Sequence, residues 1–349
     1  MAEEQEIIFQ EQTGVGIITL NRPQALNALT WSMVKKLDDV LVKWGADNSI
    51  KAVIIEGAGE RAFCSGGDVK SVALAGKDSE LAKDFFRDEY IMNNRIFNFP
   101  KPYISLIDGI VMGGGKGVSA HGSHRIVTEK VLFAMPETNI GFFPDVGGGY
   151  FLPRCPGQTG VYLALTSKRI KEADCIYIGF ATHFVPSAKL SELRSAIIQA
   201  PEQLDELLAK FAQTPDGESE IAPYREKIDK YFGRIRVEDM VSDLRQDGSL
   251  WAKETLDAMN SMSPTSLKIA LKQIRLGANM SFADVMVMEY RVSQHCMQHA
   301  DFYEGIRAAL IDKDRSPKWQ PADINDVSDE AVGEYFASLG DRDLNLNNT

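Results

Sequence analysis

The first part of the chain alternates between short apolar segments typical of strands and longer segments with helical periodicity. Residues 7–12 and 16–20 are predicted to form two paired strands around Thr13-Gly14. Thr30 is a predicted N-cap, because a side-chain oxygen at this place can accept a hydrogen bond from the first helical turn. The helix that follows is predicted from apolar residues at helical spacing: Met33, Leu37, Leu41 and Trp44.

Two compact apolar runs follow, at residues 52–56 and 103–108. Such runs are typical of strands that are buried on both faces. A glycine-rich segment, 109–117, leads from the second run into a predicted helix, and residues 125–128 form another predicted strand. Strands that alternate with helices indicate an α/β fold with parallel elements.

After about residue 186 the strand patterns stop, and only helical patterns remain. We therefore expect an α/β core over residues 1–186 and a helical C-terminal region over residues 187–349. The predicted helices of this region are 190–211, 223–232, 237–260, 264–276 and 281–312.

Composition and charge narrow the classes of partner. The chain has 349 residues, of which 44% are hydrophobic and 25% charged, as in an ordinary globular protein. Its formal net charge of -11 disfavours general nucleic-acid binding, because such a chain repels phosphate. We therefore expect no nucleic-acid partner.

The cysteines and the start of the chain suggest a compartment. The four cysteines contain no C-x-x-C pair, which argues against a zinc site and a disulfide framework and fits a reducing compartment. Residues 1–10 are acidic and lack the basic and apolar regions of a signal peptide. No apolar run approaches the roughly 18 residues of a membrane span. We expect a cytoplasmic protein without a membrane partner. The cysteines are Cys64, Cys155, Cys175 and Cys296.

Two segments resemble phosphate-binding motifs, but each lacks a required feature. Residues 57–62 follow a predicted strand and spell G-x-G-x-x-A, the dinucleotide-binding pattern. Residues 63–67 follow at once, where a helix should begin. Gly115-Lys116 resembles the end of a P-loop, but Gly117 stands where a magnesium-binding Ser or Thr is required.

Two hydrolase motifs are also incomplete in this sequence. Ser119 lies in G-x-S-x-H, which lacks the second glycine of a nucleophile elbow. His121 and His124 lack the H-E-x-x-H spacing of a zinc protease. A serine hydrolase and a metallohydrolase are disfavoured, and no metal site is predicted.

Two glycine-rich turns remain as candidates for a site. Gly66-Gly67 follows a predicted strand, where paired glycines let backbone N–H groups point into a site. The alternative is an ordinary turn in which Asp68 is a helix N-cap. Four of the five residues 113–117 are glycine, just before a predicted helix whose N-terminus favours negative charge.

A third segment, 134–149, carries two acids, Glu137 and Asp145, among apolar residues, two prolines and four glycines. Partial burial raises the pKa and the basicity of a carboxylate. The alternative is that Glu137 is a surface charge at a helix end. With the glycine turns, however, the segment suggests acyl transfer. Two backbone N–H groups would hold a thioester oxygen as it becomes an oxyanion, and a carboxylate would attack the carbonyl or activate water.

These segments carry a specific resemblance. Asn21-Arg-Pro-x-x-Leu-Asn27-Ala-Leu, the 62–68 turn, the 113–115 glycines and Pro136-Glu137 occur in the order found in the crotonase (enoyl-CoA hydratase/isomerase) superfamily. The chain resembles in particular its 3-hydroxyisobutyryl-CoA hydrolases, and this likeness covers nearly the whole chain. The resemblance implies a crotonase-like spiral of ββα units with a helical C-terminal region. The stretches that carry the likeness are 88–94, 112–115, 133–154, 263–268 and 301–319.

The resemblance also implies roles for single residues. The N–H groups of Gly67 and Gly114 would be the oxyanion donors. Glu137 would be the nucleophile or the base, Asp145 the second acid of the hydrolases, and Glu89 a residue of the substrate pocket.

The coenzyme A part of the substrate would bind at the 62–68 turn, which also contains Gly67. Its adenine would lie near the backbone of residues 62–68, with Arg22 or Lys318 near its phosphates. No cofactor is expected, because coenzyme A belongs to the substrate. The turn residues expected at the adenine are Ala62, Cys64, Gly66 and Asp68.

One departure from the superfamily pattern separates its activities. The hydratases carry a second catalytic glutamate where this chain has Gly117, and a glycine where it has Asp145. Hydration needs both an acid and a base, so hydrolysis of a short-chain 3-hydroxyacyl-CoA fits better. The expected substrate is 3-hydroxyisobutyryl-CoA of valine catabolism. An enoyl-CoA hydratase or isomerase, a non-catalytic ribosome-associated relative and a homo-oligomer remain open alternatives.

Overall fold

The computed structural model describes residues 5–346, and the contacts between their Cα atoms group the chain into two compact units. Unit 1 contains Met1–Asp68, Ile91–Phe133 and Arg169–Glu220, and unit 2 contains Val69–Tyr90, Ala134–Lys168 and Ile221–Thr349. Both units are therefore discontinuous in sequence. The expected division at residue 186 stays a prediction. Residues 1–4 of the acidic start lie outside the described residues.

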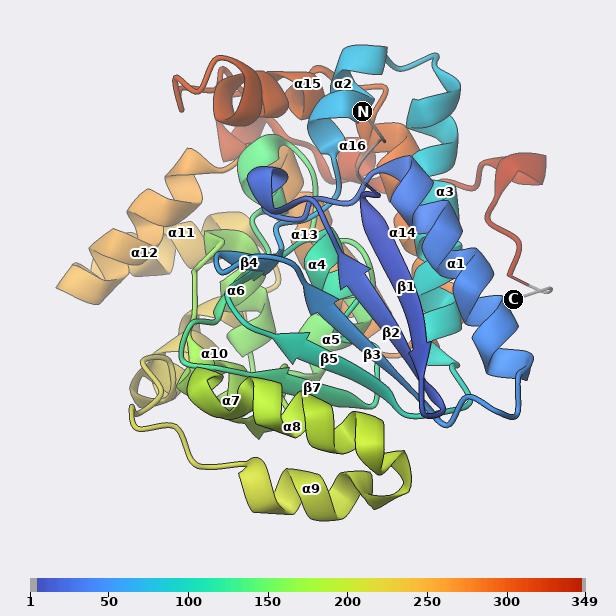
Figure 1. Cartoon of the computed structure of the whole chain (residues 1–349). Helices are drawn as coiled ribbons and strands as arrows, with labels where there is room; N and C mark the ends of the chain where they lie inside the picture. Colours follow the sequence, from blue (N-terminus) through green and yellow to red (C-terminus); the bar gives the residue numbers. More distant parts are fainter. Residues whose placement is uncertain (1–4, 347–349) are drawn as a thin grey trace. The chain divides into compact units, whose positions relative to one another are not determined.

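Unit 1 contains the strands of the fold, and Figure 1 labels most of them. Its strands are β1 (Ile7–Gln12), β2 (Val15–Leu20), β3 (Ala52–Gly57), β4 (Ala62–Cys64), β5 (Tyr103–Ile107), β6 (Ile110–Met112), β7 (His124–Val127), β8 (Leu132–Ala134, whose last residue belongs to unit 2) and β9 (His183–Phe184). Its helices are η1 (Pro23–Ala25), α1 (Trp31–Ala46), α4 (Gly114–Gly117), α7 (Glu172–Tyr177), α8 (Ser187–Gln199), η4 (Pro201–Gln203) and α9 (Leu204–Phe211). Helix α3 (Glu80–Phe97) has residues in both units.

The strands form two sheets. The larger sheet has the order β1-β2-β3-β5-β7-β9, with β1 and β2 antiparallel and the later neighbours parallel. The smaller sheet has the order β4-β6-β8. Each of the pairs β3/β4, β5/β6 and β7/β8 thus contributes its first strand to the larger sheet and its second to the smaller one. This repetition is the α/β spiral of ββα units that the sequence predicts.

Helices cover both faces of the larger sheet. Val15 and Ile17 of β2 share one hydrophobic core with Leu193 of α8 and Phe211 of α9; both helices lie below the sheet in Figure 1. Gly16, between Val15 and Ile17, faces the opposite side of the sheet. A Cβ atom there would lie 2.6 Å from the ring of Trp44 in α1. Each fully buried Leu or Phe of such a core contributes about 1.5–3 kcal/mol.

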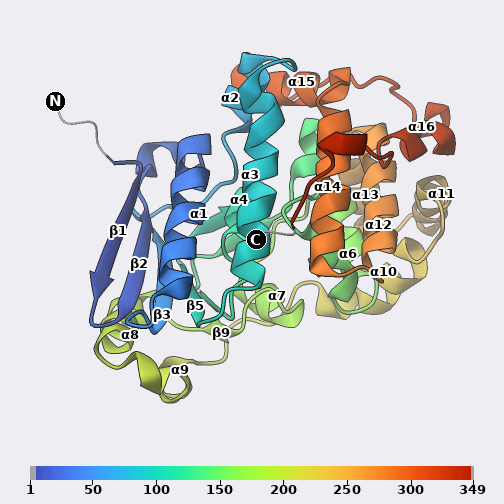
Figure 2. The ribbon, with the colours of Figure 1, turned by 90° about the vertical axis from the view of Figure 1, so that its right-hand side faces the viewer.

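Unit 2 is helical in the part that the structure describes, apart from the single residue of β8. Helices α13 and α14 stand upright in Figure 2. The elements are α2 (Val69–Ala75), η2 (Glu137–Ile140), α5 (Gly148–Phe151), η3 (Leu152–Arg154), α6 (Thr159–Thr166), η5 (Ala222–Tyr224), α10 (Arg225–Phe232), α11 (Val237–Asp247), α12 (Leu250–Ser261), α13 (Pro264–Gly277), α14 (Phe282–Cys296), α15 (Ala300–Ile306), the π-helical η6 (Arg307–Ile311), η7 (Ile324–Asp326), α16 (Asp329–Glu334) and η8 (Gly340–Arg342).

Close backbone contacts hold the short helices of unit 2. A Cβ atom at Gly277, the end of α13, would lie 1.9 Å from the carbonyl oxygen of Gly149 in α5. A Cβ atom at Gly305 of α15 would lie 2.3 Å from the carbonyl carbon of Ile140 in η2. Only glycine permits these approaches. They fix η2 and α5, the two short helices next to the predicted acids.

Most predicted elements are present, but three predicted long helices are wrong. The helix predicted over 190–211 breaks at Pro201, which cannot continue a helix. The one predicted over 237–260 breaks at Gly248, which has a φ of 62°. The one predicted over 281–312 ends at Cys296 and restarts at Ala300. The pattern also missed β6 inside the glycine-rich segment 109–117.

Candidate active site

The first glycine turn of unit 1 lies beside residues 26–29. Ser65 N–H donates to the Leu26 carbonyl (3.0 Å), Leu29 N–H to the Gly66 carbonyl (2.8 Å), and Asp68 N–H to the Leu29 carbonyl (2.8 Å). Leu29 and Gly67 therefore form a parallel bridge that uses the backbone groups on either side of Gly67. Successive N–H groups of an extended chain point in opposite directions. The N–H of Gly67 accordingly points away from Leu29.

The second glycine turn of unit 1 lies next to the first. Gly113 has a φ of 46°, which favours glycine, and Gly114 begins α4. A Cβ atom at Gly115 would lie 2.2 Å from the Cys64 carbonyl oxygen, so this helix contacts β4 through its backbone. An ideal Cβ at Gly66 would lie 3.8 Å from the Gly114 nitrogen. Within the described residues, neither Gly67 N–H nor Gly114 N–H has a backbone acceptor. Both N–H groups can therefore serve as donors to a ligand.

Asn27 holds the segment beside the first turn in place. Its side chain is fully buried, accepts a hydrogen bond from Arg22 N–H (2.9 Å), and donates to the carbonyls of Ala58 and Ala62 (2.9 Å each). Asn27 also has a φ of 56°, a conformation that asparagine tolerates better than most residues. The motif that carried the resemblance thus stabilises the turn that contains Gly67.

The residues expected near coenzyme A differ in what they can offer. Ala62 and Cys64 are buried and present almost no surface to a ligand. The Arg22 guanidinium lies 3.0 Å from a Glu6 oxygen and 3.6 Å from an Asp68 oxygen, and it donates to the Ala28 carbonyl. Arg22 is therefore already engaged with two carboxylates. A phosphate would have to compete with them.

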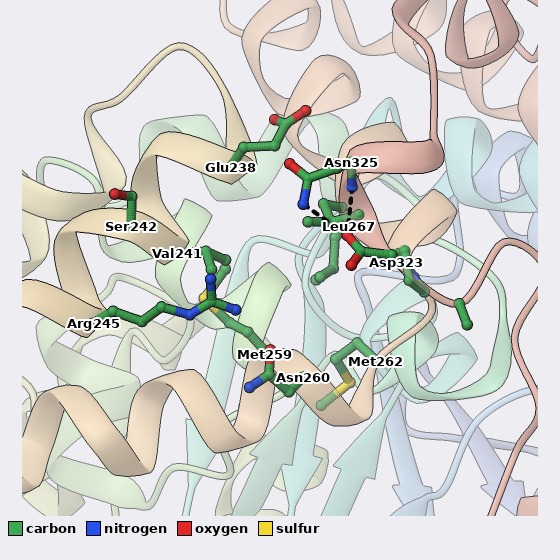
Figure 3. A pocket seen from close by; sticks show the side chains of 13 residues that line it. Glu238, Val241, Ser242, Arg245, Met259, Asn260, Met262, Leu267, Asp323 and Asn325 are labelled. Carbon is green, nitrogen blue, oxygen red and sulfur yellow. Dashed lines mark hydrogen bonds between the residues drawn. The ribbon is translucent and has the colours of Figure 1, made fainter.

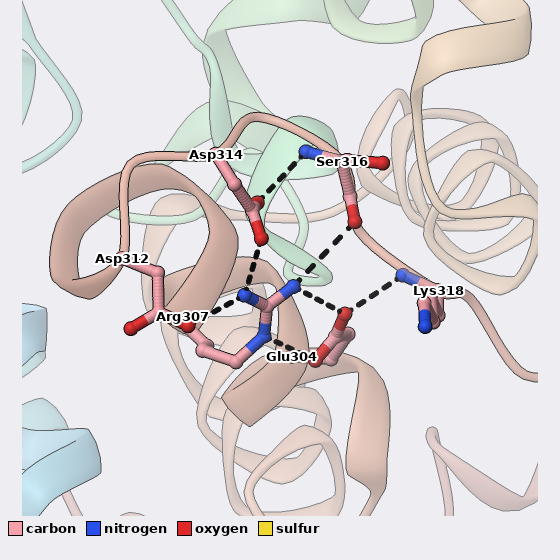
Figure 4. A network of polar contacts seen from close by, with 6 residues as sticks. All are labelled: Glu304, Arg307, Asp312, Asp314, Ser316 and Lys318. Atoms are coloured by element: carbon pink, nitrogen blue, oxygen red, sulfur yellow. Dashed lines mark hydrogen bonds and ion pairs between the residues drawn. The ribbon is translucent and has the colours of Figure 1, made fainter.

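Lys318 belongs to unit 2 and lies beside a cluster around Arg307 (Figure 4). Its backbone N–H donates to Glu304 Oε1 (2.8 Å), while its side chain is exposed. Arg307 pairs with Glu304, Asp312 and Asp314. The arrangement fixes the backbone of Lys318 and leaves its ammonium group in solvent.

Glu137 begins η2 in unit 2 and is 5% exposed. The next residue, Thr138, anchors this helix, because its hydroxyl donates to the Ala164 carbonyl (3.2 Å) and its carbonyl accepts from Ser263 N–H (3.1 Å). Gly141 ends the helix at a φ of 69°. The alternative of an exposed surface charge at Glu137 is therefore wrong.

Asp145 is equally buried, and its carboxylate has a buried donor. The Tyr90 hydroxyl donates to Asp145 Oδ2 at 2.7 Å. The Asp145 carbonyl accepts from Gly148 N–H (2.7 Å), which closes a turn ahead of α5. Val146 within this turn has a φ of 47°, which costs about 1–3 kcal/mol for a β-branched residue. Such a conformation persists only where its surroundings impose it.

Glu89 precedes Tyr90 on α3 and is 2% exposed. Burial raises the pKa of its carboxyl well above the ordinary value, and the negative charge of Asp145 raises it further. Among the described residues, its Oε1 atom has no hydrogen-bond partner. Glu89 therefore retains its proton to higher pH than an ordinary glutamate, and the neutral acid can donate a hydrogen bond.

Three residues near Asp145 were not predicted from the sequence: Tyr90, Gln273 and Glu289. The Glu289 carboxylate of α14 accepts hydrogen bonds from Gly147 N–H and from the Gln273 side chain of α13. Both side chains are fully buried. A polar residue on an apolar helix face was the only sign in the sequence that Glu289 and Gln273 have a special role. That pattern does not reveal that Glu289 binds a residue more than 100 positions away.

The predicted residues thus fall into two groups. Unit 2 contains Glu89, Glu137, Asp145 and Lys318, of which Glu89 and Asp145 lie close together. Unit 1 contains Arg22, Gly67 and Gly114 together with the 62–68 turn. Within residues 5–346, no group of three or more His, Cys, Asp or Glu side chains could hold a metal ion, and no helix has the length and apolarity needed to cross a membrane.

A pocket of about 310 Å³ in unit 2 lies elsewhere (Figure 3). It is lined by α11, α12, the start of α13 and residues 322–325. Arg245 and Glu238 supply charge, while Met259 and Met262 supply apolar surface. No predicted site residue lines it.

Comparisons with known proteins agree on one family. Residues 15–336 match the enoyl-CoA hydratase/isomerase family. The chain is 50% identical to 3-hydroxyisobutyryl-CoA hydrolase, mitochondrial, of Gallus gallus (98% of this chain, 91% of the relative) and 49% identical to that of Danio rerio (98% and 92%). A crystal structure described as a carnitinyl-CoA dehydratase from Mycobacterium thermoresistibile has a TM-score of 0.94 at 41% identity (99% of this chain, all of that one).

The match covers the strands and the helical region alike, at identities well above those of a shared fold alone. The chain belongs to the enoyl-CoA hydratase/isomerase family.

Proposed function

We propose that this protein hydrolyses the thioester of a short-chain 3-hydroxyacyl-CoA, with 3-hydroxyisobutyryl-CoA as the substrate and 3-hydroxyisobutyrate and CoA as the products, in valine catabolism. The observation that carries the proposal is the buried Asp145 carboxylate, held by Tyr90 and lying close to Glu89. The names of the Gallus gallus and Danio rerio relatives support the same reaction.

In the proposed mechanism the thioester oxygen accepts hydrogen bonds from Gly67 N–H and Gly114 N–H. The two nitrogens belong to adjacent turns. They would stabilise the negative charge that develops on the oxygen, and loss of one such donor typically costs about 100- to 1,000-fold in rate.

Glu137 would act in one of two ways. Its carboxylate could attack the thioester carbonyl, so that the C–S bond breaks, CoA leaves and a mixed anhydride forms, which water then cleaves. Alternatively, it could deprotonate a water molecule that attacks the same carbon. Asp145 would orient the substrate hydroxyl, the water or the departing thiol. Glu89, which retains its proton, would donate a hydrogen bond within the substrate pocket.

The second candidate is a hydratase, isomerase or dehydratase. It is favoured by the similar Mycobacterium thermoresistibile structure, which is described as a carnitinyl-CoA dehydratase. Gly117 argues against it, because this buried glycine of α4 occupies the place of the second catalytic glutamate and has no proton to transfer. Our assignment needs no metal or cofactor, since coenzyme A is part of the substrate.

A panel of acyl-CoA esters tests the proposal. Free-thiol release should be fastest with 3-hydroxyisobutyryl-CoA and slower with esters that lack the hydroxyl, because a site built to bind a hydroxyl rejects analogues without it. Crotonyl-CoA, followed by loss of its enoyl absorbance, tests the second candidate. Hydration of crotonyl-CoA without thiol release would overturn the assignment.

The expectations for location and partners remain predictions. The four buried cysteines form no disulfide within residues 5–346, which fits a reducing compartment such as the cytoplasm. Two relatives carry a mitochondrial name, so cell fractionation is the direct test. Size-exclusion chromatography with light scattering tests a homo-oligomer, and binding assays with RNA and vesicles test the expected absence of those partners.

A further inference from the structure

Glu289 of α14 holds the turn that contains Asp145. Its carboxylate accepts hydrogen bonds from Gly147 N–H through Oε2 (2.7 Å), from Gly149 N–H through Oε1 (2.8 Å) and from Gln273 Nε2 through Oε1 (2.9 Å). The first two donors flank the start of α5. A single carboxylate thus binds the chain immediately after Asp145, and hydrogen bonds of this kind to a charged acceptor are stronger than neutral ones.

Gln273 of α13 holds the other end of the same turn. Its Nε2 atom donates to the Pro144 carbonyl at 2.7 Å as well as to Glu289. Pro144 directly precedes Asp145, so the two side chains together fix the backbone on both sides of that residue.

The turn has little room to adopt another conformation. A Cβ atom at Gly149 would lie 3.1 Å from both Gln273 Nε2 and Glu289 Oε1, and one at Gly277 would lie 1.9 Å from the Gly149 carbonyl oxygen. Val146 is held in the left-handed region within this enclosure. The contacts between these side chains and the turn therefore determine its conformation.

The contact depends on a carboxylate at position 289. Glu289 is fully buried. Burial raises the pKa of Tyr90, and the nearby charges of Asp145 and Glu289 raise it further. The Tyr90 hydroxyl in turn donates a hydrogen bond to Asp145. Burying another carboxylate among acidic neighbours is unfavourable unless its hydrogen bonds compensate. Gly147 N–H and Gly149 N–H bind different oxygens of Glu289, so an amide in the same position would turn its NH2 group toward one of them.

We propose that Glu289 is a positioning residue for the hydrolysis: through the backbone of Gly147 and Gly149 it fixes the direction in which the Asp145 carboxylate points. Glu289 acts on the reaction only through Asp145. The inference rests on the proposed function, because it assigns Asp145 to the thioester reaction.

The test is a double-mutant cycle between positions 289 and 145, with kcat and KM measured by thiol release. Glu289→Gln should lower kcat by about 10- to 100-fold with KM changed less than about threefold, because a small misplacement of a reacting group has effects of this size. In an Asp145→Asn background the same change should alter the residual kcat less than about threefold, because the two residues act as one unit. A merely structural role would reduce kcat in both backgrounds.

Asp174→Asn is the matched control. Asp174 is also buried and accepts a hydrogen bond from Ser219, but it belongs to α7 of unit 1 and not to this turn. Its kcat should stay within about twofold of the wild-type value. An equal loss in this variant would indicate a general effect of buried carboxylates and would overturn the proposal.

Circular dichroism and thermal melting accompany each variant. If Glu289→Gln does not fold, Gln273→Met takes its place in the cycle, since it removes two donors and leaves the Glu289 carboxylate. It should lower kcat by about 3- to 10-fold, and only while Asp145 is present. A wild-type enzyme without thioesterase activity would defeat the proposed function together with this inference. An active wild type with equal effects in both backgrounds would defeat this inference alone.

Discussion

The hydroxyl of Tyr90 and the carboxylate of Asp145 form a buried hydrogen bond of 2.7 Å between α3 and the turn before α5. The two residues are 55 positions apart in the sequence. The contact gives Asp145 a fixed direction, and it leads to the first prediction.

Tyr90→Phe should reduce both stability and activity. The change leaves a buried carboxylate oxygen without this donor, which costs about 1.5–3 kcal/mol in the free energy of unfolding. We also expect kcat to fall about tenfold, because Asp145 loses its orientation. Urea unfolding and thiol release measure the two effects.

Tyr103→Phe is the control for that experiment. Tyr103 is equally buried, and its hydroxyl donates to the Val118 carbonyl at 3.0 Å. It should lose about 1–2 kcal/mol of stability with kcat unchanged. A Tyr90→Phe enzyme with full kcat would show that Asp145 does not depend on this bond.

Glu89 should make stability depend on pH. Its pKa in the folded protein lies above the ordinary value of 4.5, so the folded state binds more protons than the unfolded state at pH values between the two. The stability contributed by the protonated form is complete below about pH 4.5 and is lost as pH rises toward the folded pKa, by up to about 1.4 kcal/mol per pH unit.

Glu89→Gln should remove this loss. As pH rises from 5 to 8, the free energy of unfolding of the variant should increase relative to that of the wild type. Urea titrations at each pH measure this difference. Asp145→Asn should give a smaller gain, because the Asp145 charge is the second cause of the shift after burial. Parallel pH profiles for the wild type and Glu89→Gln would contradict a raised pKa.

Gly115→Ala should disturb the second glycine turn. The added Cβ would lie 2.2 Å from the Cys64 carbonyl oxygen, a backbone atom that cannot move aside alone. We expect a loss of about 1–3 kcal/mol in the free energy of unfolding from overpacking, and lower kcat because Gly114 shifts. Gly217→Ala, at an open position, should change stability by less than about 0.5 kcal/mol. Equal stability of the two variants would disprove the close contact.

Glu137→Gln should abolish turnover and spare binding. A general base or nucleophile accounts for about 100- to 10,000-fold in rate, whereas the amide keeps the size of the side chain. Thiol release measures the first effect and calorimetry with a CoA ester the second. Near-normal hydrolysis by the variant would remove Glu137 from the mechanism.

A single turnover of the wild type in labelled water tests whether Glu137 forms an anhydride. Label in the Glu137 carboxyl indicates the anhydride, because water then attacks an acylated carboxylate. Label found only in the product shows that water attacked the acyl carbon of the substrate, as the general-base route requires, and excludes attack at the glutamyl carbon of an anhydride.

The sequence predicted those features that depend on neighbouring residues. The apolar pattern and the Thr30 cap predicted α1, because both act within one helical turn, and the Thr30 side chain does accept from Met33 N–H. Apolar residues recur at helical spacing on both sides of Pro201 and of Gly248. The pattern therefore wrongly predicted one continuous helix through each of these residues. The glycine turns and the candidate acids were predicted from short motifs.

The remaining features depend on contacts between distant segments. Glu289 meets Gly147 across 142 positions, and nothing in the local pattern of α14 identifies that partner. Helix η2, which Glu137 begins, is likewise anchored at Thr138 by Ser263 and Ala164, which only the folded chain brings there. Long-range packing therefore decides which polar residues support the site.

Glu289 and Gln273 bind the Asp145 turn through backbone atoms alone: the N–H groups of Gly147 and Gly149 and the carbonyl of Pro144. None of these contacts involves the side chain of residue 145. The backbone at that position is consequently held independently of the side chain it carries. Evolution could have replaced one residue at this place and acquired a new acid without rebuilding the scaffold around it.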